Sequence, residues 1–261
     1  MKAFQTIRLE TEPPLILITL NRPDKRNALN PQMIAELSEA FAAAEADAKC
    51  RVVLLRAEGK AFCAGMDLEA LQQIAGQSYE KNLEDSRQLA QLFQRICTLV
   101  KPVIAVVEGP AIAGGCGLAT VCDITLATPE AKFGYTEAKI GFVAGIVAVF
   151  LIGMVGEKRA RELLLSGRLM DAAEAKQIGL VNEVVPSDGI ATRAKQIAAE
   201  LAANSPQSIA ANKRFLADIS GLDAALEKAC IANATARQSE DFKEGVRAFL
   251  EKRPPRWTGL A

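Results

Sequence analysis

The sequence predicts a mixed α/β core followed by a helical C-terminal region. Over residues 1–186, short aliphatic runs bounded by proline or glycine alternate with segments of helical periodicity. After Ser187 the pattern is wholly helical, which places a boundary near Pro186 between a core domain and a helical region over residues 187–261. The chain has 261 residues, and half of them are hydrophobic, which suffices for a sizeable core.

The expected elements of the core follow from local signals. Asn30-Pro31 is a helix cap followed by proline at the first helical position, and Asp67 can cap a helix that begins at Leu68. Strands are expected over residues 7–10, 15–20, 52–55, 103–107, 123–127 and 181–185. Helices are expected from residue 31, from residue 68 and over residues 89–100, 144–155, 157–165 and 171–177, and in the C-terminal region over 187–203, 206–219, 222–236 and 239–250.

A glycine-rich stretch after the strand at 103–107 is the centre of the chain. Gly114, Gly115 and Gly117 open a buried helix, and free N–H groups at a helix start attract negative charge. The stretch has the glycine spacing of a phosphate-binding loop, but Gly115 and Cys116 stand where that loop needs Lys and Ser/Thr. It also resembles a dinucleotide-binding fingerprint, but the last glycine of that motif is missing. Neither nucleotide-binding motif is therefore complete. From spacing alone, a role in tight helix packing is as good an interpretation as a ligand site.

Composition excludes several classes of function. Lys plus Arg equals Asp plus Glu, 31 each, so neither nucleic acid nor an anionic membrane is expected as a partner. The chain has no histidine, which removes Ser-His-Asp and Cys-His systems and His-ligated zinc, so no metal is expected. Six cysteines without a C-x-x-C pair, no apolar run of about 18 residues and no signal-peptide core predict a cytoplasmic protein with reduced thiols.

Seven segments carry a resemblance to a known family. They are NRPDKRNAL (residues 21–29), GKAFCAGMDL (59–68), KPVIAVVEGPAIAGGCGLA (101–119), FGYTEAKIGF (133–142), LLLSGR (163–168), AKQIGLVNEVVP (175–186) and EGVRAFLEKRPPRW (244–257). Their order and content resemble the crotonase family, also called the enoyl-CoA hydratase/isomerase superfamily. The resemblance implies a spiral core of repeated β-β-α turns, a C-terminal trimerisation region and a homotrimer or dimer of trimers. It also implies an acyl-CoA thioester as substrate, with no cofactor apart from the coenzyme A of that substrate.

The resemblance also implies the catalytic groups. The backbone N–H groups of Met66 and Gly114 would form the oxyanion hole, although the segment at Met66 also reads as a plain strand-to-helix turn. Related hydratases use two glutamates, one after the glycine run and one in the FGxxE loop. Here the second is Glu137, whereas the first position holds Gly117. Without the resemblance, Glu137 reads as a solvated surface carboxylate.

Binding residues are implied in the same way. Lys25 and Arg26 would contact CoA phosphates, although a charged surface loop is the alternative. The other substrate-binding residues expected are Ala28, Ala64, Asp67, Leu68, Gly117, Phe249 and Lys252, with Arg253 as an alternative to Lys252 at the phosphates.

Three functions fit these residues. The first is an enoyl-CoA hydratase that adds water to a 2-enoyl-CoA, for a branched or dicarboxylic acyl chain, through an enolate held in the oxyanion hole. The second is a Δ3-Δ2 enoyl-CoA isomerase that uses the single carboxylate of Glu137. The third is a non-catalytic acyl-CoA-binding relative, which would not need Glu137.

Overall fold

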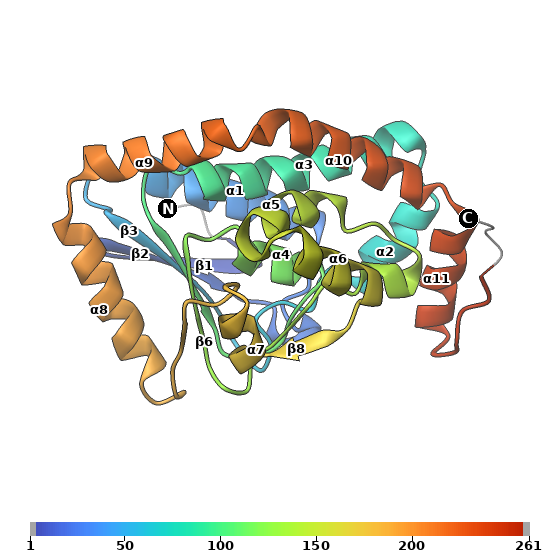
Figure 1. The fold of residues 1–261 in the computed structure, drawn as a ribbon, viewed down its shortest axis with the longest axis horizontal. Helices are drawn as coiled ribbons and strands as arrows, with labels where there is room; N and C mark the ends of the chain where they lie inside the picture. Colours follow the sequence, from blue (N-terminus) through green and yellow to red (C-terminus); the bar gives the residue numbers. More distant parts are fainter. Residues whose placement is uncertain (1–3, 258–261) are drawn as a thin grey trace.

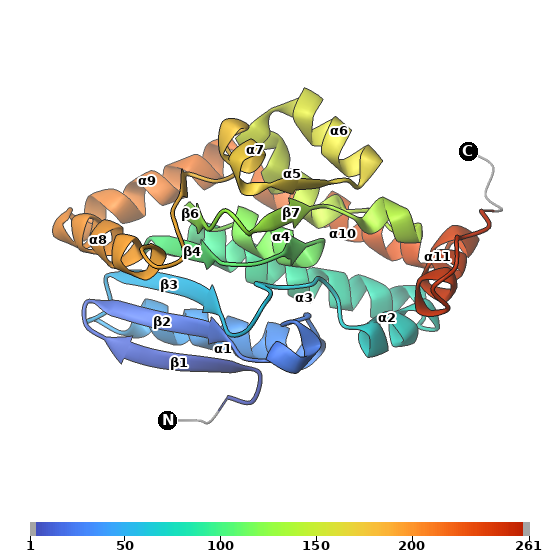
Figure 2. The ribbon, with the colours of Figure 1, turned by 90° about the horizontal axis from the view of Figure 1, so that it is seen from below.

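The computed structural model describes residues 4–257. The protein is built around a six-stranded sheet (Figure 2). The strand order is β1-β2-β3-β4-β6-β9, and all neighbours are parallel except the β1–β2 hairpin. A second sheet of three strands has the order β5-β7-β8. The bounds are β1 Ile7–Glu12, β2 Leu15–Leu20, β3 Val52–Ala57, β4 Val103–Val107, β5 Ala111–Ile112, β6 Ile124–Ala127, β7 Lys132–Gly134, β8 Leu169–Asp171 and β9 Glu183–Val184.

Helices cover both faces of the large sheet and extend beyond its edge. Their bounds are α1 Pro31–Ala46, α2 Leu68–Ala75, α3 Tyr79–Thr98, α4 Gly114–Thr120, α5 Gly145–Val155, α6 Glu157–Ser166, α7 Ala172–Gln177, α8 Ile190–Ala203, α9 Pro206–Ile219, α10 Leu222–Arg237 and α11 Glu240–Leu250, with 3-10 turns η1 Pro23–Lys25 and η2 Glu137–Ile140. In Figure 1, α9 and α10 run along α3, and α11 lies beside α2. The helical C-terminal region therefore folds back over the core of its own chain.

The alternation of side chains along β2 explains why the sheet is buried on both faces. Ile16, Ile18 and Leu20 join the large core cluster on the side of α1 and α3. Leu15 and Leu17 point to the other face, where α8 covers them. Because every residue of β2 is buried, the strand is a continuous apolar run, as is typical of strands covered on both faces.

The predicted α/β core with a helical C-terminal region is confirmed, and the expected apolar helix at 144–155 is α5. The expected strand at 181–185 is shorter, because only Glu183 and Val184 pair with β6. All six cysteines are free, and within residues 4–257 no helix is long and apolar enough to cross a bilayer. The division of the chain into two domains at Pro186 stays a prediction.

Candidate active site

A cavity with a volume of about 400 Å³ and a largely apolar wall, called the main cavity below, lies where the C-terminal helices meet the core. Its wall combines the start of α4, the turn η2, and residues of α2, α5, α10 and α11. Of the residues implied by the resemblance, six line it: Ala64, Met66, Gly114, Glu137, Phe249 and Arg253, the alternative to Lys252. They are distant in the sequence, so the fold brings them together.

Two loops of the site run side by side in parallel register. Cys63 pairs with Ala111, and the N–H of Ile112 donates to the carbonyl oxygen of Cys63 at 2.9 Å. The chain at Gly65, with φ of +90°, approaches the second loop so closely that an added Cβ would lie 3.2 Å from Cβ of Ala113. The residues that precede Met66 and Gly114 are therefore in close contact.

The backbone before Gly114 adopts a conformation that is rare for alanine. Ala113 has φ of +51° and ψ of −125°, and its N–H is held by the carbonyl oxygen of Gly134 at 2.7 Å. Strained backbone of this kind persists only where its surroundings fix it, and it is concentrated at functional sites. Among the described residues, the N–H groups of Met66 and Gly114 donate to no acceptor, so both remain available to a ligand oxygen in the cavity.

Glu137 opens the turn η2 and is a buried carboxyl group. Glu137 is 6% exposed, and its Oε2 has no hydrogen-bond partner within the described part of the chain. Burial raises the pKa of Glu137 to about 7, because transfer out of water disfavours the ionised form. A carboxyl group that changes charge near neutral pH suits proton transfer.

Packing leaves no room for a side chain at Gly117, the position where the resemblance implies the first of the two glutamates. A Cβ on Gly117 would lie 2.7 Å from Cγ2 of Val147 and 2.9 Å from Cε2 of Phe93. Gly117 is buried in α4 and does not line the cavity, whereas Val147 does. The sequence could not show this, because Val147 and Phe93 come from α5 and α3.

Tyr135, two residues before Glu137, is a polar side chain that points into the core. It is 0% exposed, and its hydroxyl is 2.7 Å from Oγ1 of Thr120. It therefore does not supply the missing partner of Glu137.

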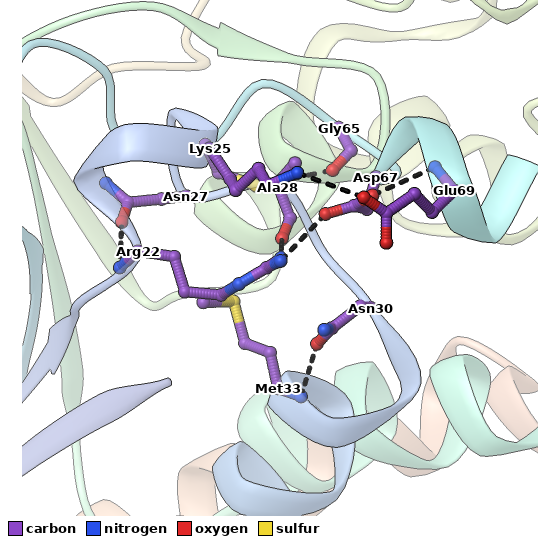
Figure 3. Close-up of polar contacts among 10 residues, drawn as sticks. Arg22, Lys25, Asn27, Ala28, Asn30, Met33, Gly65, Asp67 and Glu69 are labelled. Carbon is purple, nitrogen blue, oxygen red and sulfur yellow. Dashed lines mark hydrogen bonds and ion pairs between the residues drawn. The ribbon is translucent and has the colours of Figure 1, made fainter. Parts of the chain in front are cut away.

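Three of the residues expected to bind the substrate, Lys25, Arg26 and Ala28, lie in the loop around η1 and do not line the cavity (Figure 3). Nζ of Lys25 is 3.1 Å from Oε1 of Glu69, and both side chains are exposed. Arg26 is exposed, and its carbonyl oxygen accepts from the N–H of Ala64 at 3.0 Å. Contacts of Lys25 and Arg26 with CoA phosphates stay predictions.

Asp67 and Ala28 are engaged within the protein. Asp67 is 5% exposed, accepts from Nη2 of Arg22 at 2.8 Å and caps α2 through the N–H of Glu69 (Figure 3). The carbonyl oxygen of Ala28 accepts from Nη1 of the same arginine at 2.6 Å. These contacts brace the loop just before and after Met66, so both residues position the donor loop rather than line the cavity.

The remaining expected residues differ in their placement. Leu68 is 49% exposed at the start of α2 and does not line the cavity. Phe249 lines it and is 52% exposed. Of the two cations near the C-terminus, Arg253 lines the cavity and Lys252 does not.

Sequence reasoning missed two polar residues of α10 on the cavity wall. Asn233 is 3% exposed, and its Oδ1 accepts from the N–H of Gly145 at 3.2 Å. Arg237 lies one turn later and is also 3% exposed. Residues four positions apart lie on the same face of a helix, and this spacing is the only sequence signal that places Asn233 and Arg237 together.

No group of three or more acidic or cysteine side chains that would hold a metal ion occurs in the part of the chain described. The cavity therefore offers two free backbone donors, one carboxyl group near neutrality and mostly apolar walls. Fixed donors of this kind stabilise negative charge that develops on a carbonyl oxygen. An arrangement of this kind can polarise a carbonyl group and move a proton.

Comparison with known proteins agrees with this chemistry. The family model described as enoyl-CoA hydratase/isomerase matches residues 10–260. A Thermus thermophilus protein named "Putative enoyl-CoA hydratase" is 46% identical over 243 residues, which cover 92% of this chain and 96% of the relative. The 2,3-dehydroadipyl-CoA hydratase of Escherichia coli is 36% identical over 248 residues, 94% of this chain and 95% of that one. The crystal structure of an enoyl-CoA hydratase/isomerase from Xanthobacter autotrophicus is similar, with a TM-score of 0.88 and 35% identity over 98% of this chain and 100% of that chain.

The chain belongs to the enoyl-CoA hydratase/isomerase family, within the crotonase superfamily. The resemblance found in the sequence and the crotonase fold it implied are both confirmed.

Proposed function

We propose that the protein is a hydro-lyase that adds water to a 2-enoyl-CoA thioester and forms a 3-hydroxyacyl-CoA. The observation that carries the proposal is the buried carboxyl group of Glu137 in the same cavity as the free N–H groups of Met66 and Gly114. The coenzyme A of the substrate is the only cofactor that this chemistry needs.

The proposed reaction balances with one carboxyl group. The oxygen of water bonds to C3, and the electron pair of the double bond moves through the thioester onto its carbonyl oxygen. The N–H groups of Met66 and Gly114 hold that oxyanion, and each such donor is worth about 3 kcal/mol in the transition state. The protonated carboxyl group of Glu137 gives its proton to C2 as the enolate collapses. The proton lost by the water returns to the carboxylate of Glu137.

Solvent-accessible cations support the proposal that the protein binds the coenzyme. Arg253 lines the cavity with its side chain 31% exposed. Lys25, Arg26 and Lys252 are exposed and complete the proposed phosphate contacts. For the acyl part, we favour a branched or dicarboxylic chain, supported by the similarity to the 2,3-dehydroadipyl-CoA hydratase.

A Δ3-Δ2 enoyl-CoA isomerase is the second candidate. One observation favours it: Glu137 is the only carboxylate on the cavity wall among residues 4–257, and a double-bond shift needs only one. In that reaction Glu137 must be ionised to take a proton from C2, and it then returns the proton to C4. A non-catalytic binding protein would have no use for a buried, unpartnered carboxyl group, which costs stability.

We also propose assembly as a homotrimer or a dimer of trimers in a reducing compartment such as the cytoplasm. An exposed apolar face on α9 supports assembly, because Phe215, Leu216 and Ile219 are each more than 60% exposed. The six free cysteines support a reducing compartment, because thiols stay reduced there. Light scattering should give three or six times the chain mass of 27.9 kDa, and a monomer at micromolar concentration would refute the assembly.

Incubation with matched 2-enoyl-CoA and 3-enoyl-CoA esters tests the reaction, with products followed by mass spectrometry. Hydration adds the mass of water, whereas isomerisation leaves the mass unchanged and converts the 3-enoyl ester. Substrate turnover without a mass change would replace the hydratase by the isomerase. Binding of the esters without any conversion would leave the non-catalytic relative.

A further inference from the structure

Arg237 is a buried cation on the wall of the main cavity, and the proposed reaction does not use it. It ends α10, is 3% exposed and lines both the main cavity and a smaller one of about 30 Å³. Met66 and Ile74 also line both cavities, so the two adjoin at Arg237. A charged side chain this deeply buried is unusual unless it is paired.

Two contacts hold the guanidinium in place without neutralising it. Nη1 donates to the carbonyl oxygen of Asn82 at 3.2 Å, and the guanidinium carbon lies 5.3 Å from the ring centroid of Phe142. Nε is buried and has no acceptor within residues 4–257. A buried donor without an acceptor costs free energy, so the site is incomplete as it stands.

No carboxylate of the described chain forms an ion pair with Arg237. Asp85 is a carboxylate whose charge opposes the lowering of the pKa of Arg237, but it is itself paired with Lys81 at 3.1 Å. Burial lowers the pKa of Arg237 to about 10, so the side chain still carries its charge at neutral pH. Glu137 is not its partner, because burial raises the pKa of Glu137 and no neighbouring cation lowers it.

The missing anion fits the distal end of the acyl chain better than the coenzyme. The phosphates of coenzyme A are large and strongly hydrated, and the exposed cations Lys25, Arg26 and Lys252 are proposed to bind them. Arg237 is instead buried, and it shares the cavity wall with the buried apolar side chains of Leu71, Ile74 and Leu89. An apolar wall that includes one buried cation matches a hydrocarbon chain that carries a carboxylate.

We propose that Arg237 is a specificity-determining residue that binds a carboxylate at the far end of the acyl chain, so that the enzyme prefers dicarboxylic 2-enoyl-CoA substrates. This inference rests on the proposed hydratase function. The planar guanidinium, held by Asn82 and Phe142, presents its remaining donors to a carboxylate in a fixed orientation. The competing explanation is a water molecule in the small cavity, which is large enough for one and would satisfy Nε without any ligand.

Two six-carbon 2-enoyl-CoA thioesters, one ending in a methyl group and one in a carboxylate, test the inference with wild type and Arg237→Met. Wild type should prefer the carboxylate substrate. Arg237→Met should lower kcat/KM for that substrate by about 10- to 100-fold, mainly through KM, the loss expected for a charged hydrogen bond. Activity on the methyl-ended substrate should stay within about threefold. Arg237→Lys should recover part of the preference, because it restores the charge without the fork.

A matched control is Arg253→Met, which removes another arginine of the same cavity. Arg253 is already paired with Glu244 at 2.6 Å and its side chain is 31% exposed, so its loss should affect both substrates by the same factor. An equal loss on both substrates in Arg237→Met, or a wild type that prefers the methyl-ended ester, would overturn the inference and leave Arg237 as a structural residue. If Arg237→Met does not fold, Arg237→Gln gives the same comparison.

The failure of the hydratase proposal would be separately visible. If wild type hydrates neither ester, binding of the saturated six-carbon thioesters decides the role of Arg237. Wild type should then bind the carboxylate-ended thioester at least about 10-fold tighter than Arg237→Met does, with no such difference for the methyl-ended one. Equal binding by the two proteins would overturn the inference.

Discussion

The carboxyl group of Glu137 should make the protein less stable as pH rises through neutrality, and Glu137→Gln should remove that loss. Burial raises the pKa of Glu137 from 4.5 to about 7. The folded chain therefore binds this proton more tightly than the unfolded chain does. Between those two values, only the folded state keeps the proton, so the free energy of unfolding falls as pH rises and the loss is complete above about pH 7.

The magnitude follows from the size of the shift. One pKa unit is worth 1.36 kcal/mol, so the full shift corresponds to about 3 kcal/mol above neutral pH. Glutamine keeps the shape of the side chain and cannot ionise. Glu137→Gln should thus be about 3 kcal/mol more stable than wild type at pH 8.5 and within about 1 kcal/mol of it at pH 5.

Urea denaturation at both pH values, at one fixed protein concentration, measures this difference. Glu157→Gln is the control, because Glu157 is exposed in α6 and its substitution should change the free energy of unfolding by less than about 0.5 kcal/mol at either pH. A stability gain of Glu137→Gln that is the same at pH 5 and pH 8.5 would refute the burial argument. The variant should also lose at least about 10²-fold in turnover while it still binds CoA esters.

Two further predictions concern the glycines of α4. Gly114→Pro should abolish turnover because it removes a donor N–H. Gly114→Ala should have only a mild effect, since the new Cβ only reaches ordinary contact with Cδ1 of Leu29 at 3.4 Å. Steady-state rates of the two variants check this prediction. Gly117→Glu should lower the melting temperature and restore no second catalytic carboxylate, because its Cβ would clash with Val147 and Phe93; a folded variant with faster hydration would contradict this.

The pH dependence of kcat/KM separates the two candidate reactions. Hydration as proposed needs Glu137 protonated to give its proton to C2, so the rate should fall about tenfold per pH unit above pH 7. Isomerisation needs Glu137 ionised, so the rate should instead rise through pH 7 and level off. A hydration rate that is constant from pH 6 to pH 9 would show that Glu137 is not the proton donor.

Much of the site could be predicted from local sequence. Glycines after a strand mark close backbone approach, and the motif positions of Met66 and Gly114 lie on paired loops in the structure. What could not be predicted depends on contacts between distant segments. Asp67 reads as a helix cap or a ligand contact, and only the fold brings Arg22 to it across 45 positions. Arg237 lies just beyond the helix expected over residues 222–236, and only the packing of α10 against α3 and α5 buries it.

Glu137 and Arg237 line one cavity, and neither perturbs the pKa of the other. A cation that acted on Glu137 would favour the carboxylate and lower its pKa, and the group could then no longer hold a proton near neutral pH. Burial is the main influence on the pKa of Glu137, while the guanidinium of Arg237 is held by Asn82 and Phe142. A dicarboxylic substrate that neutralises the buried cation would therefore leave the pKa of Glu137 unchanged. Such a substrate should therefore lower KM without shifting the pH at which hydration declines, whereas contact between the two groups would shift both.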